Sequence, residues 1–237
     1  MCSASDDREL EAGSGEREGR LPVSRSPLPV VHAVTDDLIL TRHDFRDRAR
    51  DVMSALGPRG AVHLRARIIP AASLLAMAEW IAGVREETGC WLVVNDRVDV
   101  ALAADADGVQ LTSRSLAVAD ARRLAPELAV GASIHEVEAG IEAERAGADW
   151  VVAGHVFETA SHPGEEGRGL PFIAALRRRV HLPVVAIGGI VPARVAELRA
   201  AGVHGVAAIS GIWGAHDAER AATDYLSAYD GARSPAR

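Results

Sequence analysis

Residues 147–188 read GADWVVAGHVFETASHPGEEGRGLPFIAALRRRVHLPVVAIG and contain a complete strand–helix–strand unit. Apolar, β-branched runs at 150–157 and 183–188 flank a helical pattern at 171–179. Strands that alternate with helical patterns are typical of βαβ units in a parallel sheet. This stretch therefore predicts an α/β fold.

The same alternation covers the chain from Pro27 onward. We expect strands at Pro29–Thr35, Ala61–Arg67, Trp91–Asn95, Gly108–Leu111, Ala129–His135, Trp150–Phe157, Pro183–Gly188 and Gly205–Ser210. Helical patterns follow at 43–56, 71–88, 98–105, 115–125, 136–146, 171–179, 192–201 and 216–229. Eight such units predict a single-domain (β/α)₈ TIM barrel over residues 27–230. The alternative is an open doubly wound sheet, but no G-x-G-x-x-G follows the first strand.

Three short joins repeat along this region, at 106–109, 147–151 and 202–206, each from a helix end to a strand start. Outside it, residues 1–26 are polar and predict a disordered tail, and residues 231–237 form a C-terminal tail. The first tail has no apolar signal segment, so we expect a cytoplasmic protein. No apolar run reaches the roughly 18–20 residues that cross a bilayer, so we expect no membrane span.

The composition excludes several classes of function. All 26 basic residues are arginine, which excludes Schiff-base aldolases, pyridoxal-phosphate enzymes and P-loop nucleotidases, since each needs a specific lysine. Arginine can still hold phosphate or carboxylate. A net charge of −7 and nine aromatic side chains (four Trp, two Tyr, three Phe) argue against a nucleic-acid partner.

In a TIM barrel the active site lies at the carboxyl ends of the strands. On the second strand, alternation places His63, Arg65 and Arg67 inside the barrel. Buried arginines need a counter-anion, so the two arginines indicate an anionic ligand. The alternative is an internal salt bridge, such as one between Arg67 and Asp36.

On the fifth strand, Ser133 and His135 are expected to face the barrel axis, with His135 at the mouth. A histidine titrates near neutral pH and can take up and return a proton, so His135 is the candidate general acid–base. The alternative is a structural or surface histidine.

The loops after the seventh and eighth strands contain Gly188, Gly189, Ser210 and Gly211. Glycine lets backbone N–H groups approach a ligand closely, and these two loops are the usual phosphate site of the architecture. The four residues therefore predict a phosphate monoester site. The alternative role of the glycine pair is a tight turn.

Two further segments are less specific. The long glycine-rich stretch 154–169, with His155 and His162, is either a cover over the mouth or an exposed loop. Asp96, after Asn95 at the end of the third strand, could ligate magnesium, but the loop 111–115 offers no second carboxylate. We therefore expect no metal.

Several motifs together resemble the thiamine phosphate synthase superfamily over about residues 28–230. They are His-Leu-Arg-Ala-Arg at 63–67, Val-Asn-Asp-Arg-Val-Asp-Val-Ala-Leu at 94–102, Ala-Asp-Gly-Val-Gln-Leu at 106–111, Gly-His-Val-Phe-Glu-Thr at 154–159, Ala-Ile-Gly-Gly-Ile at 186–190 and Ile-Ser-Gly-Ile at 209–212. Within the superfamily, 154–159 with 166–169, and 133–135, look like the TenI branch, the thiazole tautomerases. The histidine of 133–135 matches that branch's proton-transfer residue.

The chain departs from the pattern of true synthases at three places. His63 and Arg67 stand where Gln and Lys are expected, Ser115 where a magnesium-ligating Asp is expected, and 159–162 where Thr-x-Thr-Lys is expected. Asn95 and Asp96 are retained.

The resemblance thus implies a cofactor-free thiazole tautomerase, an isomerase of thiamine biosynthesis. It would convert the exocyclic-alkene tautomer of carboxythiazole phosphate to the aromatic form, with His135 moving the proton. Gly188, Gly189, Ser210 and Gly211 would hold the phosphate. The substrate carboxylate would lie on Arg65 with Arg67 or Asn95, and Ser133 would orient the ring. The family also suggests a homodimer.

Two alternatives remain open. One is a thiamine phosphate synthase, which couples a pyrimidine pyrophosphate to thiazole phosphate with magnesium. The other is a noncatalytic barrel that binds a phosphate ligand in a regulatory role.

Overall fold

The computed structural model describes residues 27–159 and 163–231. The predicted tail 1–26, residues 232–237 of the predicted C-terminal tail, and His162 lie outside the described residues.

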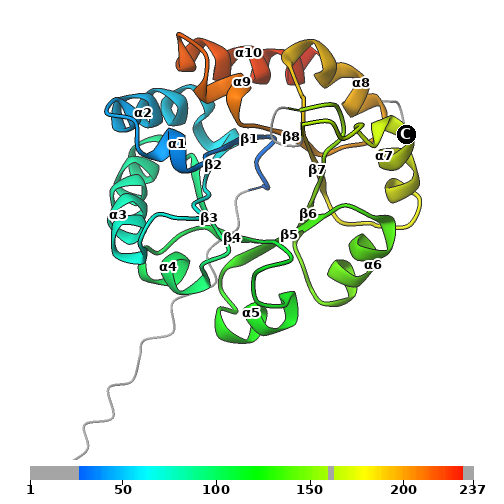
Figure 1. The fold of residues 1–237 in the computed structure, drawn as a ribbon, viewed down its shortest axis with the longest axis horizontal. Helices are drawn as coiled ribbons and strands as arrows, with labels where there is room; N and C mark the ends of the chain where they lie inside the picture. Colours follow the sequence, from blue (N-terminus) through cyan, green and yellow to red (C-terminus); the bar gives the residue numbers. More distant parts are fainter. Residues whose placement is uncertain (1–26, 160–162, 232–237) are drawn as a thin grey trace, which may run out of the picture.

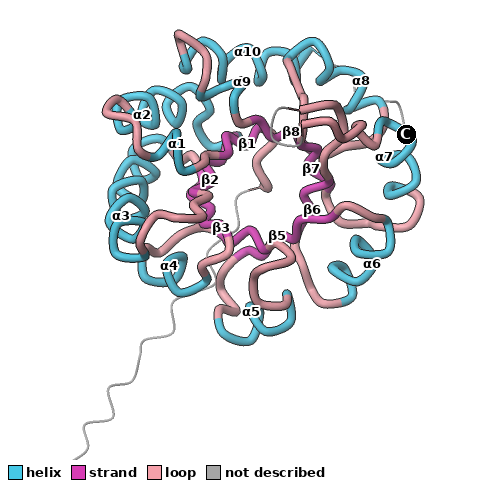
Figure 2. Tube along the Cα trace, viewed as in Figure 1, coloured by secondary structure: helices cyan, strands magenta, loops and turns pink. Residues whose placement is uncertain are grey.

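Eight parallel strands form one closed ring, in which β1 pairs with both β2 and β8 (Figures 1 and 2). The strands are β1 Val31–Val34, β2 Gly60–Leu64, β3 Trp91–Asn95, β4 Gly108–Leu111, β5 Ala129–Ile134, β6 Trp150–Ala153, β7 Val184–Ile187 and β8 Gly205–Ala208. The closed ring confirms the predicted (β/α)₈ barrel and excludes the open sheet.

Helices surround the ring (Figure 1). They are α1 Asp37–Leu40, α2 Phe45–Leu56, α3 Ala71–Thr88, α4 Val98–Ala103, α5 Val118–Leu124, α6 Val137–Arg145, α7 Gly169–Arg177, α8 Val195–Ala200, α9 Ser210–Trp213 and α10 Ala218–Gly231, with 3₁₀ turns η1 Gly57–Arg59 and η2 Pro192–Arg194. The short helices α1 and α9 extend the predicted pattern. Within the described part of the chain, no helix is both long and apolar enough to span a bilayer.

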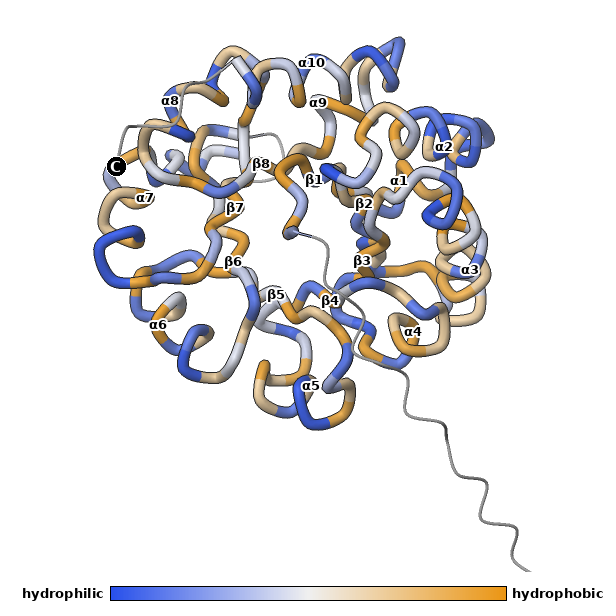
Figure 3. Tube along the Cα trace, turned by 180° about the vertical axis from the view of Figure 1, so that it is seen from behind, coloured by the Kyte–Doolittle hydropathy of each residue, from blue (hydrophilic) through white to orange (hydrophobic). Residues whose placement is uncertain are grey.

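Strand alternation divides the buried side chains into two cores. Outward residues such as Val62 and Leu64 pack under the helices, whereas inward residues such as Trp91, Val93 and Trp150 fill the barrel. Figure 3 shows hydrophobic colour along much of the ring and hydrophilic segments on the outer helices. His63, between Val62 and Leu64, therefore faces the interior, as the alternation predicts.

Residues Pro27–Val30 cover the amino end of the barrel. Leu28 packs against the inner core, and its carbonyl oxygen lies 2.9 Å from Nε2 of His204. At the same end, two aspartates from the predicted joins bond to the neighbouring strand. The Asp107 carboxylate accepts from the N–H of Leu92 in β3 at 2.8 Å, and the Asp149 carboxylate accepts from the N–H of Val130 in β5 at 2.7 Å. These contacts close the end opposite the predicted active site.

The β2 strand ends at Leu64, three residues earlier than predicted. Beyond Leu64, side-chain oxygens accept the backbone N–H groups in place of the neighbouring strand. Thr35 Oγ1 accepts from the Arg65 N–H at 3.0 Å, and the Asp37 carboxylate accepts from the N–H of Arg67 at 3.0 Å. Arg65 and Arg67 thus belong to a loop at the mouth and not to the strand interior.

Candidate active site at the carboxyl ends of the strands

Arg65 lies partly buried at the mouth, and Arg67 is exposed. Burial, followed by the nearby guanidinium groups of Arg67 and Arg114, lowers the pKa of Arg65, while Asp96 and Asp36 oppose this shift. Arg67 and Arg114 lie close enough to act on Arg65, and a group of three cations favours an anion between them. The predicted anion-binding role of Arg65 fits this arrangement.

The alternative salt bridge between Arg67 and Asp36 is not among the ion pairs of the described residues. Asp36 instead caps α1 by accepting from the N–H of Ile39 at 2.9 Å. Asp37 holds the next loop, since it also accepts from the N–H groups of Ile68 and Ile69.

Asp96 follows β3 with a backbone φ of 64°. Its Oδ1 accepts from Thr112 Oγ1 at 2.6 Å, from the Thr112 N–H at 3.1 Å, and from Ser115 Oγ. The Ser115 side chain therefore donates a hydrogen bond to the Asp96 carboxylate and does not place a second carboxylate beside it. The described residues contain no group of three or more His, Cys, Asp or Glu side chains arranged to hold a metal.

A polar chain crosses the barrel interior below the mouth. The Trp150 Nε1–H donates to Gln110 Oε1 at 2.9 Å, and Gln110 Nε2 donates to Ser133 Oγ at 3.0 Å. Because indole can only donate, it fixes the orientation of the Gln110 amide. Ser133 then accepts from Gln110 and keeps its own O–H proton for a ligand.

A second polar group lies between β1, β2 and β3. His32 Nδ1 lies 2.8 Å from His63 Nε2, and His32 Nε2 lies 3.0 Å from the Pro29 carbonyl oxygen. Burial lowers the pKa of His63 to about 4, and burial followed by His63 lowers that of His32 well below its usual value. Both rings are therefore neutral at physiological pH. The His63 ring also contacts the side chain of Asn95.

Sequence reasoning missed His32, Gln110 and Trp150 as parts of the interior. A signal was present for His32 and Gln110, because each occupies an inward position of its strand between apolar outward neighbours, whereas Trp150 follows Asp149 at the start of β6. Their hydrogen-bond partners come from other strands, and one sequence does not show these pairings.

His135 follows β5 and is exposed at the carboxyl end of the barrel. Its Nδ1 lies 2.8 Å from the Gly154 carbonyl oxygen. A carbonyl can only accept, so Nδ1 carries the proton and the neutral ring presents Nε2 as an acceptor.

Gly188 and Gly189 follow β7 with φ values of 102° and 62°. The segment after β6 packs directly on them: the Phe157 N–H donates to the Gly188 carbonyl at 3.0 Å, and a Cβ on Gly188 would lie 2.4 Å from that of His155. The glycines thus permit a close approach of two loops as well as a turn. In the described part of the chain, the N–H groups of Gly188 and Gly189 donate no backbone hydrogen bond.

The loop after β8 begins α9 with Ser210 and Gly211, both exposed. A Cβ on Gly211 would lie 2.3 Å from the Tyr225 hydroxyl, which donates to the Ile190 carbonyl at 2.6 Å. The N–H groups of Ser210 and Gly211 also donate no backbone hydrogen bond among the described residues. Since β7 and β8 are neighbours, two loops with free N–H groups lie on adjacent strands.

The predicted cover 154–169 is anchored at both sides. The Arg168 N–H donates to the His155 carbonyl at 3.1 Å, and His155 Nε2 lies 3.2 Å from the Glu166 carbonyl oxygen. His155 itself is buried. Residues 160–162, in the middle of the segment, lie outside the described residues.

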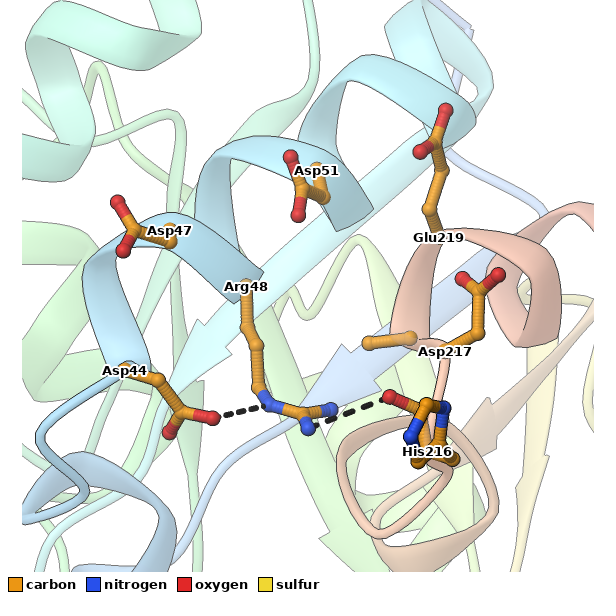
Figure 4. A pocket seen from close by; sticks show the side chains of 8 residues that line it. Asp44, Asp47, Arg48, Asp51, His216, Asp217 and Glu219 are labelled. Atoms are coloured by element: carbon orange, nitrogen blue, oxygen red, sulfur yellow. Dashed lines mark hydrogen bonds and ion pairs between the residues drawn. The ribbon is translucent and has the colours of Figure 1, made fainter.

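A surface pocket of about 350 Å³ lies outside the ring, between α2 and the start of α10 (Figure 4). Five carboxylates line it, those of Asp44, Asp47, Asp51, Asp217 and Glu219. Its arginine, Arg48, is paired with Asp44 at 2.7 Å and bonds the Ala215 and His216 carbonyls. This negative charge would repel a phosphate group, so the pocket does not suit the predicted phosphate ligand.

The fold and the mouth define a (β/α)₈ barrel with arginines, a carboxylate and free N–H groups at the carboxyl ends of its strands. The chain belongs to the thiamine monophosphate synthase family, whose model matches residues 31–212. It is 40% identical over 194 residues to the thiamine-phosphate synthase of Methanoculleus marisnigri, covering 81% of this chain and 91% of that protein. The corresponding Pyrococcus furiosus protein is 36% identical over 184 residues, or 77% and 89% of the two chains.

A solved structure from the same family is also similar to this chain. The thiamine phosphate pyrophosphorylase of Pyrococcus furiosus superposes with a TM-score of 0.76 at 32% identity, covering 87% of this chain and 97% of that one. A 3-hexulose-6-phosphate synthase, at 18% identity and a TM-score of 0.63, shares the fold.

These relatives confirm the predicted superfamily and overturn the finer interpretation. The proteins that are 34–40% identical over most of the chain are named thiamine-phosphate synthase, a transferase. The prediction of a thiazole tautomerase, and of an isomerase of the TenI branch, is therefore wrong. It relied on two short motifs, at 133–135 and at 154–159 with 166–169, and on the departures from the synthase pattern at His63, Arg67, Ser115 and 159–162; relatives named as synthases at up to 40% identity outweigh both.

Proposed function

We propose that the protein is a thiamine-phosphate synthase, which joins a pyrimidine diphosphate to a thiazole phosphate. The observation that carries this proposal is its 40% identity to a protein of that name over 91% of the relative's length. In the coupling, the thiazole nitrogen bonds to the pyrimidine methylene carbon. The carbon–oxygen bond to diphosphate breaks, and the diphosphate leaves with the electron pair.

The departing diphosphate carries a high negative charge, so its leaving is helped by fixed cations. We assign this task to Arg65, which is partly buried, and to Arg67 and Arg114 beside it. Arginine binds phosphate oxygens with a planar fork of donors and stays charged. The arginines would thus supply the charge that a lysine supplies elsewhere, since this chain has none.

The residues at the mouth fit a magnesium ion that is shared with the substrate. Mg²⁺ commonly uses one or two carboxylates together with substrate phosphates and water. Asp96 is the carboxylate that would hold it, because hydrogen bonds from Thr112 and Ser115 fix the carboxylate through Oδ1 alone. When bound, the ion would neutralise charge on the leaving diphosphate.

The second substrate is assigned to the opposite side of the mouth. The free N–H groups of Gly188, Gly189, Ser210 and Gly211 would hold the thiazole phosphate. Ser133 would donate its hydroxyl proton to a ring, and His135 would offer Nε2 as an acceptor at the rim.

The test is a direct assay. The purified protein is incubated with the pyrimidine diphosphate and the thiazole phosphate, with and without MgCl₂, and thiamine phosphate and diphosphate are quantified together. We expect both products in equal amounts, and only with magnesium. Absence of thiamine phosphate at saturating substrates and magnesium would refute the proposal.

A matched pair of variants localises the activity. Asp96→Asn should lower kcat by about 10²-fold, since an amide binds Mg²⁺ poorly. Asp99→Asn removes a carboxylate that is paired with Arg97 on the nearby surface and should leave the rate unchanged. Equal rates for the two variants would contradict the role of Asp96.

A further inference from the structure

Residues 65–70, the arginine loop, connect β2 to α3 and carry Arg65 and Arg67. The loop begins beyond Leu64, the last residue of β2 that pairs with a neighbouring strand. Its tip is not held by burial, since Arg67 is exposed and the Ile68 side chain is 82% exposed. The position of the tip therefore depends on polar contacts.

The Asp37 carboxylate supplies these contacts. Its Oδ1 accepts from the N–H groups of Arg67 and Ile68, each at 3.0 Å, and from that of Ile69 at 3.3 Å. Its Oδ2 also accepts from the Arg67 N–H, at 3.1 Å. Burial raises the pKa of Asp37, but the hydrogen bonds from the three N–H groups outweigh burial and lower it below its usual value. The arginine loop thus binds the charged form of the carboxylate.

The three residues that follow β1 have separate tasks. Thr35 holds the start of the arginine loop, since its Oγ1 accepts from the Arg65 N–H at 3.0 Å. Asp36 caps α1 by accepting from the N–H of Ile39 at 2.9 Å. Asp37 bonds to the tip of the loop. Two adjacent aspartates therefore carry equal charge, but one supports its own helix and the other supports the arginine loop.

We infer that Asp37 is a positioning residue that sets the arginine loop to receive a diphosphate group at the mouth. This inference rests on the proposed function, which assigns Arg65 and Arg67 to the departing diphosphate. Donors that are already in place lose less conformational freedom when a ligand binds. Without Asp37, a fraction of the molecules holds the loop in the binding geometry, and the apparent affinity falls in proportion to that fraction.

The sign of the effect separates positioning from charge. Removal of a negative charge strengthens the binding of a nearby anion by Coulomb's law, whereas loss of positioning weakens it. Asp36 provides the matched control. Burial lowers the pKa of Arg65, and the nearby charge of Asp36 opposes this shift. Asp36→Ala therefore removes an equal charge and a helix cap, and it leaves the hydrogen bonds of the arginine loop in place.

The first test measures binding by calorimetry, with inorganic diphosphate titrated in the presence of MgCl₂. Asp37→Ala should bind diphosphate about 5- to 20-fold more weakly than the wild type, as expected when a small fraction of the loop is in place. Asp36→Ala should bind it equally or more tightly. Unchanged or tighter binding by Asp37→Ala, or equal weakening in both variants, would overturn the inference.

Hydrogen exchange of the free protein, followed by NMR, tests the loop itself. The amide groups of Arg67 and Ile68 should exchange faster in Asp37→Ala than in the wild type, and at the wild-type rate in Asp36→Ala. Equal rates in all three proteins would show that the carboxylate does not hold the tip, and the inference would fail.

The coupling assay distinguishes this inference from the proposed function. In Asp37→Ala the KM for the pyrimidine diphosphate should rise by the same factor as the diphosphate Kd, and the KM for the thiazole phosphate should stay constant. A smaller folded fraction would lower kcat and leave both KM values unchanged. An equal rise in both KM values would refute the role of Asp37 and leave the proposed function intact.

If the wild type makes no thiamine phosphate but the two variants differ in diphosphate binding as expected, the proposed function fails and the role of Asp37 stands. A wild type that binds no diphosphate would refute both. If Asp37→Ala does not fold, Asp37→Asn replaces it. Its amide keeps one acceptor oxygen and places N–H donors where Oδ2 accepted from Arg67, so diphosphate binding should weaken by a smaller factor. Unchanged binding by that variant would count against the inference.

Discussion

Replacing Gly188 by alanine should destabilise the protein far more than the same change at Gly147. Both residues have positive φ values, 102° and 89°, so an alanine at either site pays about 1–2 kcal/mol for the left-handed backbone. At Gly147 nothing lies within 4 Å of the added Cβ. At Gly188 the Cβ would lie 2.4 Å from the Cβ and 2.8 Å from the Cα of His155, so backbone must move.

Overpacking of this kind costs about 1–3 kcal/mol beyond the backbone term. We therefore expect the unfolding free energy to fall by about 2–5 kcal/mol in Gly188→Ala and by about 1–2 kcal/mol in Gly147→Ala. Urea unfolding, followed by circular dichroism and fitted with a common m-value, measures both. The Gly188 variant should also bind phosphate more weakly, because the loop after β6 is displaced from the loop after β7.

A difference between the two variants of less than about 1 kcal/mol would refute the reasoning, because it would mean that the two loops separate freely. The Gly147 variant serves as the control for the φ term alone. A change in m-value in either variant would indicate an altered denatured state instead.

Three further predictions concern the mouth and the interior. Arg65→Met should weaken binding of magnesium diphosphate by about 10-fold or more, measured by calorimetry, because one of the cations at the mouth is lost. Thermal stability should not fall, because the removed cation is partly buried beside other cations. Unchanged affinity would contradict the anion site. Gln110→Leu should lower the unfolding free energy by about 2–4 kcal/mol, because the Trp150 N–H loses its buried acceptor, and a neutral effect in urea would show that the polar chain is not needed. Burial lowers the pKa of His63 to about 4, so below pH ~6.5 the unfolded chain binds more protons than the folded protein. The free energy of unfolding should therefore fall as the pH drops from about 6.5 to about 4. His63→Gln should flatten that part of a curve of stability against pH.

The barrel could be predicted from the sequence because its signal is repeated. Each unit places an apolar, β-branched run before a helical pattern, and the inward position of His63 follows from alternation alone. The strand ends could not be predicted as well. The β2 strand ends at Leu64 because Thr35 and Asp37, about thirty residues earlier, accept the next N–H groups.

The candidate site was predictable at the level of which loops meet, since the carboxyl ends of parallel strands lie on one face of a barrel. Arg65 and the glycine loops were predicted in this way, and the structure places them at the carboxyl ends of the strands. The reaction was not predictable, because short motifs such as 154–159 define a superfamily and leave the chemistry open. The hydrogen-bond partner of Ser133, Gln110, comes from the neighbouring strand β4, so the orientation of Ser133 needed the structure.

The covered amino end has a consequence for access to the interior. Leu28 packs against the inner core at the amino end, so the inward side chains of the strands are sealed on that side. Gln110 and Ser133 on the inner face would then be reached from the carboxyl end, past the loops that follow the strands. A change in those rim loops would therefore alter access to the interior without touching the polar groups themselves.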